Sequence, residues 1–327
     1  MKNKICIGVA TRRRPQMFAR LLDSFVHLNR PDDTLLQFVF IENDDVLHIN
    51  DVVKNFAGKL GQEETVYADI EPRLGIPVVR NRILDTALNL QSNCLASIDD
   101  DEIADPNWLV ELYSEAQNRK LDMMGGVTRM EEFDASNLPI FQKLVYHDLR
   151  ARQEKSERQS ADRHASGRDG AIKIATGNML CRLDFIRRNQ IRFDETLRFS
   201  HGEDHDFYLQ VKDAGGATGY APRALVHEIV HMNRLSPRFQ FNLSRNVARA
   251  SYNVRYAQNK RRASREWVRS SCFVLGKVVL GCSRLLCSCF NRGRSFVRGI
   301  KGIAAAIGRL EAMLGAQDVH YKHTDGH

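Results

Sequence analysis

Residues 94–102, with the sequence CLASIDDDE, join an apolar run directly to four consecutive acids. A short apolar run is typical of a buried strand. The acids cannot remain in that core, because burying unpaired carboxylates is too unfavourable. The chain therefore emerges here and presents the carboxylates at the C-terminal end of the strand, where open α/β sheets bind ligands. Crowded carboxylates repel one another unless a cation lies among them, and their hard oxygens suit Mg²⁺ or Mn²⁺. An acidic surface turn is the alternative interpretation.

The residues that precede this stretch alternate between strand-like and helix-like patterns. Three earlier strands are predicted at residues 5–10, 35–41 and 65–68. Helices are predicted after them, at residues 15–25, 46–60 and 78–90. This alternation predicts a mostly parallel sheet with helices on both faces. The second strand also ends in acids, including Glu42 and Asp44, so both acidic strand ends should face one crevice. No Gly-x-Gly-x-x-Gly motif follows the first strand, which argues against a dinucleotide site.

The pattern is more varied on the C-terminal side of the acids. A helix is predicted from Asp105, and a strand is predicted at residues 123–127. Residues 150–170 are highly charged and nearly lack large apolar side chains, which predicts a mobile loop or a disordered insertion. Acids meet an apolar helix again at residues 202–208.

The composition is that of an ordinary globular protein. The chain has 327 residues, of which 43% are hydrophobic and 27% charged. A net charge of +8 favours anionic partners such as nucleotides, nucleic acid or an anionic membrane surface. The seven cysteines include no Cys-x-x-Cys pair, so we expect a reducing cytosol rather than a disulfide framework. The N-terminal apolar run is too short for a signal peptide, and we expect it to be the first strand.

The C-terminal region, residues 238–327, combines basic and apolar residues. Residues 273–290 are almost wholly apolar apart from Lys277 and Arg284, which lie seven positions apart and share a helical face. A second amphipathic segment follows, whose apolar face runs from Ile300 to Leu314 and whose basic face has Arg294, Arg298 and Lys301. Such helices suit the plane of an anionic membrane interface. A transmembrane span and two packed helices of a soluble domain are the alternatives.

Residues 3–235 resemble the family 2 glycosyltransferases, which have the GT-A fold, a mixed Rossmann-like sheet with helices on both faces. The motifs that carry the resemblance follow one another as Ala10-Thr11-Arg12, Glu42-Asn43-Asp44, Gly75 to Asn81, Asp99-Asp100-Asp101, Thr176-Gly177-Asn178 and Gly202-Glu203-Asp204. Within the family, the chain is most similar to glucosyltransferases of bacterial exopolysaccharide (succinoglycan-type) assembly. The resemblance implies a catalytic domain at residues 1–237, with a nucleotide-sugar half at 1–102 and an acceptor half at 103–237.

The resemblance also implies roles for individual residues. The nucleotide-sugar would be bound by Thr11, Arg12, Glu42, Asp44, Arg80, Asp99 and Asp100. A metal ion would be held by Asp101, Asp99 and His227. The acceptor would lie against Thr176, Gly177 and Asn178. Independently of the resemblance, the position and charge of residues 150–170 predict a loop that closes over the acceptor. Asp204 would be the general base, with Glu203 beside it. The implied donor is a UDP-sugar, and the implied acceptor is polyprenyl-linked or an oligosaccharide. We expect a cytoplasmic enzyme on the inner face of the cell membrane.

The chemistry agrees with these roles. Displacing a nucleoside diphosphate from a sugar builds negative charge on the leaving phosphate, which a metal ion and an arginine can stabilise. A sugar hydroxyl is a poor nucleophile until a carboxylate accepts its proton. One base and one metal fit an inverting single displacement. The alternative for Glu203 and Asp204 is a pair of helix N-terminal acids favoured by the helix dipole.

Three other functions compete with this interpretation. His227-Glu228-Ile229-Val230-His231 matches the His-Glu-x-x-His signature of zinc peptidases, which places both histidines on one face of a helix. No third ligand follows at a suitable spacing. A nucleic-acid-binding protein is suggested by the basic C-terminal region, but few aromatics accompany its basic residues, so we expect no nucleic-acid partner. A nucleotidyltransferase would show a glycine-rich loop after the first strand, where this chain has Arg12-Arg13-Arg14.

Overall fold

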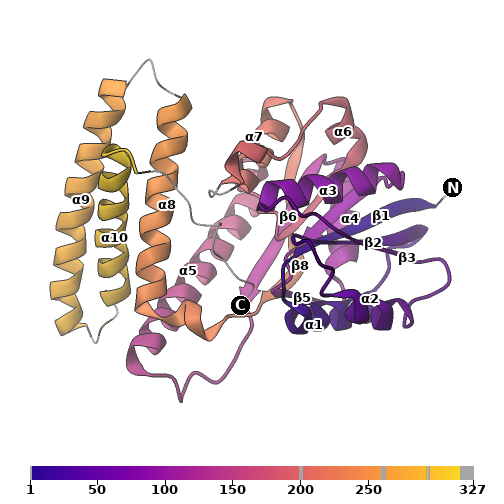
Figure 1. Ribbon diagram of the computed structural model, residues 1–327, viewed down its shortest axis with the longest axis horizontal. Helices are drawn as coiled ribbons and strands as arrows, with labels where there is room; N and C mark the ends of the chain where they lie inside the picture. Colours follow the sequence, from indigo (N-terminus) through magenta and orange to yellow (C-terminus); the bar gives the residue numbers. More distant parts are fainter. Residues whose placement is uncertain (1, 199–201, 259–262, 292, 294, 317–327) are drawn as a thin grey trace.

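The fold is built on one mixed, eight-stranded sheet with the strand order β3-β2-β1-β4-β7-β6-β8-β5 (Figure 1). The computed structural model describes residues 2–198, 202–258, 263–291, 293 and 295–316. The strands are β1 Asn3–Thr11, β2 Thr34–Glu42, β3 Thr65–Ile70, β4 Cys94–Ile98, β5 Glu102–Ala104, β6 Met123–Met130, β7 Asn178–Arg182 and β8 Thr218–Glu228. The first four strands pair in parallel, and β7 pairs antiparallel to both β4 and β6. The expected mixed sheet is confirmed.

Helices cover both faces of the sheet because the inner strands are apolar on both sides. Along β1, Ile5 and Ile7 join a core with three helices, and Cys6 joins the opposite core. The first core is covered by α1 Pro15–Val26, α2 Asn50–Ala57 and α4 Trp108–Arg119. The second is covered by α3 Ile76–Asn89, α6 Leu183–Arg188 and α7 Glu203–Asp213.

The helix α1 shows how local sequence sets these elements. Pro15 occupies its first turn, where a missing N–H and a preset φ are tolerated. Phe18, Leu21, Leu22 and Phe25 follow at the spacing of one helical face, and all four are buried against the sheet. The Phe25 ring stacks on Trp108 of α4, with ring centroids 6.4 Å apart.

The prediction of a loop or disordered insertion at residues 150–170 is wrong. Most of this segment belongs to α5 Ile140–Ala165, followed by a 3-10 turn at Asp169–Ala171. The helix contains neither glycine nor proline and is rich in Arg, Glu, Gln, Lys and Ala, which are strong helix formers. Only one side of its first half is buried, around Val145 and Tyr146, so its low apolar content suggested disorder. A packed helix of this kind is not a mobile lid.

Three helices form the C-terminal region at one end of the molecule, beside α5 (Figure 1). They are α8 Pro237–Gln258, α9 Ala263–Phe290 and α10 Phe296–Met313. The helix α10 packs against both α8 and α9. Predictions for residues 260–262, 294 and 317–327 lie outside the described residues.

Candidate active site

The acidic strand ends meet at one edge of the sheet. Thr11 and Glu42 are register partners at the ends of β1 and β2, and β4 ends beside them at Ile98. Because these strands are parallel, the residues that follow them emerge on the same side. The Thr11 hydroxyl donates a 2.7 Å hydrogen bond to Asp100, which follows β4. The residues that follow β1, β2 and β4 therefore lie at one edge of the sheet.

Asp100 is tied to the protein through both carboxylate oxygens. Oδ2 accepts from Thr11, and Oδ1 accepts from Arg14 Nη1 at 3.0 Å. Burial raises the pKa of Asp100 to about 6. This carboxylate holds the start of α1 against the end of β4, and Arg14 was not predicted as its partner.

The predicted base-binding acids differ in their surroundings. Glu42 is fully buried and accepts from the backbone amides of Arg13 at 2.9 Å and Ile49 at 3.2 Å. Asp44 forms an ion pair with the guanidinium of Arg13, which holds the pKa of Asp44 well below its usual range. Glu42 therefore fixes the backbone at Arg13 and at Ile49. The Arg13–Asp44 pair lies beside it, and the half-buried Arg12 precedes Arg13 in the chain.

Arg80 joins two motifs that lie far apart in the sequence. Its Nη1 donates to Glu203 Oε1 at 2.8 Å, and its Nη2 donates to Asp99 Oδ1 at 3.2 Å. The field of Asp204 also acts on Arg80 and on Asp99. Burial is the main reason that the pKa of Asp99 is raised. The acids after β4 and the acid pair that begins α7 therefore form one site around a single guanidinium.

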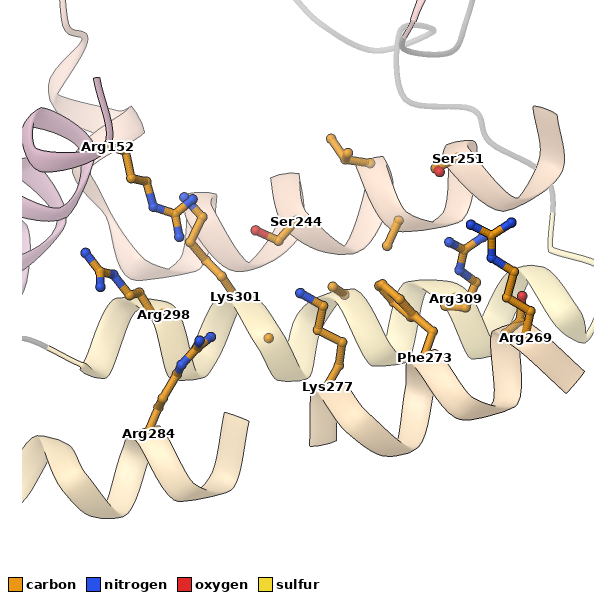
Figure 2. Close-up of a pocket in the computed structure, with 15 residues that line it drawn as sticks. Arg152, Ser244, Ser251, Arg269, Phe273, Lys277, Arg284, Arg298, Lys301 and Arg309 are labelled. Atoms are coloured by element: carbon orange, nitrogen blue, oxygen red, sulfur yellow. The ribbon is translucent and has the colours of Figure 1, made fainter. Parts of the chain in front are cut away.

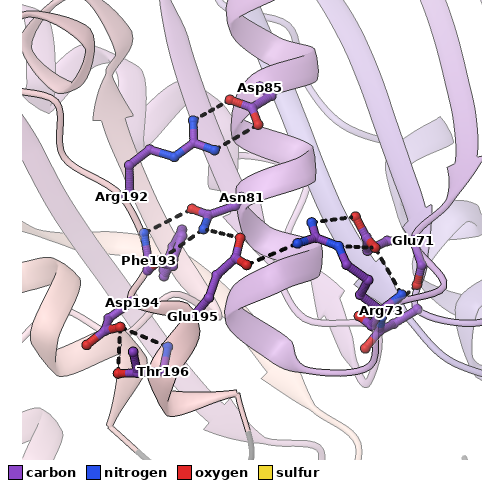
Figure 3. Close-up of polar contacts among 10 residues, drawn as sticks. Glu71, Arg73, Asn81, Asp85, Arg192, Phe193, Asp194, Glu195 and Thr196 are labelled. Atoms are coloured by element: carbon purple, nitrogen blue, oxygen red, sulfur yellow. Dashed lines mark hydrogen bonds and ion pairs between the residues drawn. The ribbon is translucent and has the colours of Figure 1, made fainter.

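The asparagine after Arg80 braces the same region from behind. Asn81 accepts from the Phe193 amide at 3.0 Å and donates to the Phe193 carbonyl at 2.9 Å and to Glu195 (Figure 3). Glu195 also pairs with Arg73 in the loop before α3. These contacts fix the segment before α7 against α3. In the Arg-Asn dipeptide, Arg80 therefore contacts the acids, whereas Asn81 holds the backbone at Phe193 in place.

Four carboxylates, from Asp99, Asp101, Glu102 and Glu228, form an acid cluster at the end of β4 and in the β5–β8 pair. Glu102 and Glu228 face each other in the register of those strands. Burial raises the pKa of Glu102 and Glu228, and the neighbouring carboxylates raise both further. Arg234 lies against this cluster, with Nη2 2.8 Å from Asp101 Oδ2 and Nη1 3.0 Å from Glu228 Oε1.

The acid cluster suits a divalent cation in its chemistry. All four donors are carboxylates whose mutual repulsion an ion would relieve. Over the described ranges, no group of three or more His, Cys, Asp or Glu side chains is arranged to hold an ion by itself. Mg²⁺ is commonly held by one or two carboxylates together with substrate phosphates and water. The chemistry of these residues is therefore compatible with an ion that arrives with a diphosphate.

His227 is placed less favourably than the sequence suggested. It pairs with Ile103 across the β5–β8 ladder, next to Glu228. Successive side chains of a strand point to opposite faces, so the direction of Glu228 toward the acid cluster directs His227 away from it. The same strand excludes the zinc-peptidase alternative. Residues up to Glu228 belong to β8, and His231 precedes a 3-10 turn at Met232–Leu235, so the two histidines share no α-helix.

The predicted acceptor residues divide into two kinds. The Asn178 amide donates to the carbonyls of Val127 and Ala224 and accepts from Trp108 Nε1 at 2.9 Å, so this side chain is used internally. Gly177 lies against the acid cluster, because a Cβ there would come 2.8 Å from Asp99 Oδ2. The adjacent Thr176 is buried.

A cavity of about 400 Å³ opens between α5 and the sheet. Its lining includes Gly126, Thr128, Arg152, Lys173, Asn178 and Tyr220. We call it the α5 cavity. Its lining lies within residues 125–220 and includes Asn178 of the Thr-Gly-Asn motif.

Sequence reasoning missed Arg14, Glu102, Glu228 and Arg234. Glu102 belongs to the quoted acidic run, and its alternation with Asp101 at the start of β5 was a usable signal. Glu228 was quoted in the peptidase signature and in the family resemblance, but without a role in the site. Arg234 carries no motif, because it approaches Asp101 only through the path of the chain after β8.

Comparisons with known proteins agree with this geometry. The family model "Glycosyltransferase like family 2" matches residues 3–263. The succinoglycan biosynthesis protein ExoM of Rhizobium meliloti (strain 1021) is 30% identical over 236 residues, which are 71% of this chain and 69% of ExoM.

The chain was also compared with solved structures, and the fold is shared with the first of the two that follow. The mannosyltransferase PcManGT from Pyrobaculum calidifontis, solved with GDP-Man and Mn²⁺, gives a TM-score of 0.57 at 11% identity. That match covers 97% of this chain and 89% of PcManGT. TarS from S. aureus, solved with UDP-GlcNAc, gives 0.49 at 13% identity over 96% of this chain and 92% of TarS. The family match and the identity to ExoM show that the chain belongs to glycosyltransferase family 2 and is a glycosyltransferase with the GT-A fold.

Proposed function

We propose that this protein is a metal-dependent, inverting glycosyltransferase that moves a sugar from a UDP-sugar to a lipid-linked or saccharide acceptor. The observation that carries the proposal is the position of Arg80 between Asp99 and Glu203. One guanidinium connects the acids suited to a metal-bound diphosphate with the carboxylate pair suited to activating a hydroxyl. Synthesis of a cell-surface polysaccharide is the proposed setting, supported by the relative named for succinoglycan biosynthesis.

The proposed reaction is a single displacement. The acceptor hydroxyl oxygen forms a bond to the anomeric carbon as the bond from that carbon to the diphosphate oxygen breaks. Asp204 takes the hydroxyl proton, and the bonding electrons leave with the diphosphate. A bound Mg²⁺ or Mn²⁺ would stabilise the charge that develops on that leaving group.

Arg80 and Arg234 act on the same charge. Both guanidiniums lie against carboxylates of the acid cluster, Arg80 on Asp99 and Arg234 on Asp101. An entering metal ion would take over the carboxylates, and the diphosphate would become the new partner of the two arginines. The arginines would then turn from their carboxylates toward phosphate oxygens, for which a guanidinium fork is well suited.

The base of the donor is proposed as uracil. The Arg13–Asp44 pair and the Thr11–Asp100 pair border the end of β1 where a base would lie. A guanine nucleotide is the competing donor, since PcManGT was solved with GDP-Man. The nature of the transferred sugar does not follow from these contacts.

The C-terminal helices are proposed to hold the enzyme on the cytoplasmic face of the membrane. The segment Trp267–Phe290 of α9 spans 24 residues with a mean hydropathy of 1.7, and 6% of its apolar window is buried. Such a helix can lie in the interface or cross the bilayer, by length and composition alone.

The test is nucleotide binding by calorimetry, with UDP and GDP, each in the presence and absence of Mn²⁺. We expect Mn²⁺-dependent UDP binding that Asp101→Asn weakens by at least about tenfold, because one carboxylate ligand is lost. Asparagine keeps the volume of the side chain and an acceptor for Arg234. The matched control is Asp105→Asn. The Asp105 carboxylate accepts a turn hydrogen bond from the Asn107 amide and lies outside the acid cluster.

The outcomes separate the parts of the proposal. If GDP binds more tightly than UDP, the proposed donor base is guanine and not uracil, and the proposed reaction class stands. Equal UDP binding with and without Mn²⁺ would contradict the proposed metal dependence. If neither nucleotide bound, the donor assignment itself would be wrong.

A further inference from the structure

A second cavity of about 420 Å³ lies among α5, α8, α9 and α10, far along the chain from the catalytic motifs. Seven cationic side chains line it, namely Arg152, Arg269, Lys277, Arg284, Arg298, Lys301 and Arg309. None of the described residues that line it is acidic. We call it the basic groove. In Figure 2, Arg152, Arg298 and Lys301 gather toward one end, and Arg269 and Arg309 toward the other.

Internal carboxylates neutralise only part of this charge. Asp148 lies behind the groove and pairs with Arg152 and Arg298, at 2.9 Å in each case. Within the described ranges, no carboxylate pairs with Arg269, Lys277 or Arg284. Cations brought this close repel one another, so the groove favours a multiply charged anion.

Buried polar groups support an anion site. Arg309 is only 4% exposed, and its guanidinium lies over the rings of Tyr252 and Phe273, at 5.5 and 4.8 Å from their centroids. Ser270 is 1% exposed, and its Oγ has no hydrogen-bond partner in the described part of the chain. Burial and the charge of Arg152 lower the pKa of Lys301 to about 8. A bound phosphate would satisfy the hydroxyl and relieve the crowding of charge.

An exposed apolar surface adjoins the groove on α9. Lys277 and Arg284 point into the groove, whereas Leu275, Val279 and Leu286 are between 59% and 70% exposed. The whole helix is amphipathic in this sense, with cations on its inner face and bare apolar side chains on its outer face. This is the arrangement that a lipid requires, with its charged group beside its chain.

The groove also connects with the acceptor half of the enzyme. Arg152 lines both the basic groove and the α5 cavity. An anion near Arg152 would therefore sit where the two cavities adjoin, and a sugar attached to it could occupy the α5 cavity. Bulk phospholipid would not use this junction, because its headgroup carries no glycan.

We infer that the basic groove binds the diphosphate of an isoprenoid lipid, with the hydrocarbon chain along the exposed face of α9 and the attached glycan directed into the α5 cavity. The inference rests on the proposed function for the identity of the glycan as the acceptor. The anion site itself follows from the groove.

The test is flotation of the full-length protein with vesicles of phosphatidylcholine, containing either undecaprenyl diphosphate or phosphatidylglycerol at matched surface charge. The variant is Lys277→Gln with Arg284→Gln, which leaves no carboxylate without a partner. The control is Lys155→Gln with Arg238→Gln, which removes two exposed charges from α5 and α8 outside the groove. No donor is added.

We expect tighter binding to the undecaprenyl diphosphate vesicles, and a loss of about tenfold or more in the groove variant, since each cation near a membrane contributes roughly fivefold. The control should keep the preference. Equal binding to both vesicle types would show that the groove binds bulk anionic phospholipid. If the groove variant and the control lost binding equally, the binding would be diffuse electrostatic attraction and not a property of the groove. Full competition by inorganic diphosphate with no preference for the lipid would make it a soluble-anion site. Each of these results overturns the inference.

Asp101→Asn separates this inference from the proposed function. If it loses UDP binding and keeps vesicle binding, the two sites are independent. If the protein binds the lipid but no nucleotide, the inference about the groove stands and the assignment of a UDP-sugar donor is wrong.

Discussion

Arg80 and Asp204 show how single side chains make a site from separate motifs. The Arg80 guanidinium contacts Asp99 and Glu203, and the field of Asp204 reaches both Arg80 and Asp99. Asp204 itself is half-buried in the first turn of α7, where the helix dipole favours an acid. The position alone therefore does not distinguish a base from a helix-stabilising residue.

Asp204→Asn distinguishes them. We expect kcat for transfer to fall by about 10² to 10⁴, since the hydroxyl proton loses its acceptor, with the affinity for UDP unchanged. Asp206→Asn is the matched control in the same turn, because Asp206 accepts from Gln210 along the helix. Both variants are measured by steady-state transfer and by calorimetry. If the two lost the same activity, or if Asp204→Asn lost only stability, the role of Asp204 would be structural.

At the scale of elements, α9 and α10 approach so closely that glycine is needed where they cross. A Cβ at Gly281 would come 2.8 Å from Ile303 Cγ1 and 3.1 Å from the Gly299 carbonyl. A Cβ at Gly299 would meet the Gly281 carbonyl at 3.1 Å in return. Small residues thus bring the backbones together and fix the inner face of α9 over the basic groove.

Gly281→Ala should separate these helices. We expect a loss of about 1–3 kcal/mol in the free energy of unfolding, the usual effect of overpacking. Gly276→Ala is the control on the same helix, since a Cβ there meets no atom within 4 Å. Alanine at that position should stabilise by up to about 1 kcal/mol through helix propensity. Urea unfolding followed by circular dichroism measures both, and equal effects would refute the close crossing.

At the scale of the whole molecule, one side chain connects the charge of the basic groove with pH. Lys301 of α10 faces Arg152 and Asp148 of α5 and donates to Gln240 of α8 at 2.7 Å. With a pKa of about 8, Lys301 is protonated below that pH and loses its charge as the pH rises through it. The groove therefore keeps this charge at neutral pH and loses it as the pH rises above about 8.

Binding to undecaprenyl diphosphate vesicles should weaken between about pH 7 and pH 9, by roughly fivefold for the one charge lost. Lys301→Arg keeps its charge throughout and should not show this part of the decrease. Any other group that titrates between pH 7 and pH 9 affects the wild type and Lys301→Arg equally. The quantity to compare is therefore the difference in vesicle affinity between these two proteins. Parallel decreases in the two proteins would show that Lys301 does not contribute.

The sequence alone determined five of the eight strands, most helices and the acidic strand ends, because apolar periodicity and the exclusion of carboxylates from a core are local effects. It did not predict β5, β7 or β8, which pair with strands far away in the sequence. It failed at α5, whose charged composition hid a regular helix. Only the tertiary structure placed Arg234 against Asp101, turned Glu228 rather than His227 toward the acid cluster, and gathered seven cations from α5, α9 and α10 into one groove. Those contacts depend on strand register and helix crossing, which join residues more than a hundred positions apart, and no local pattern encodes them.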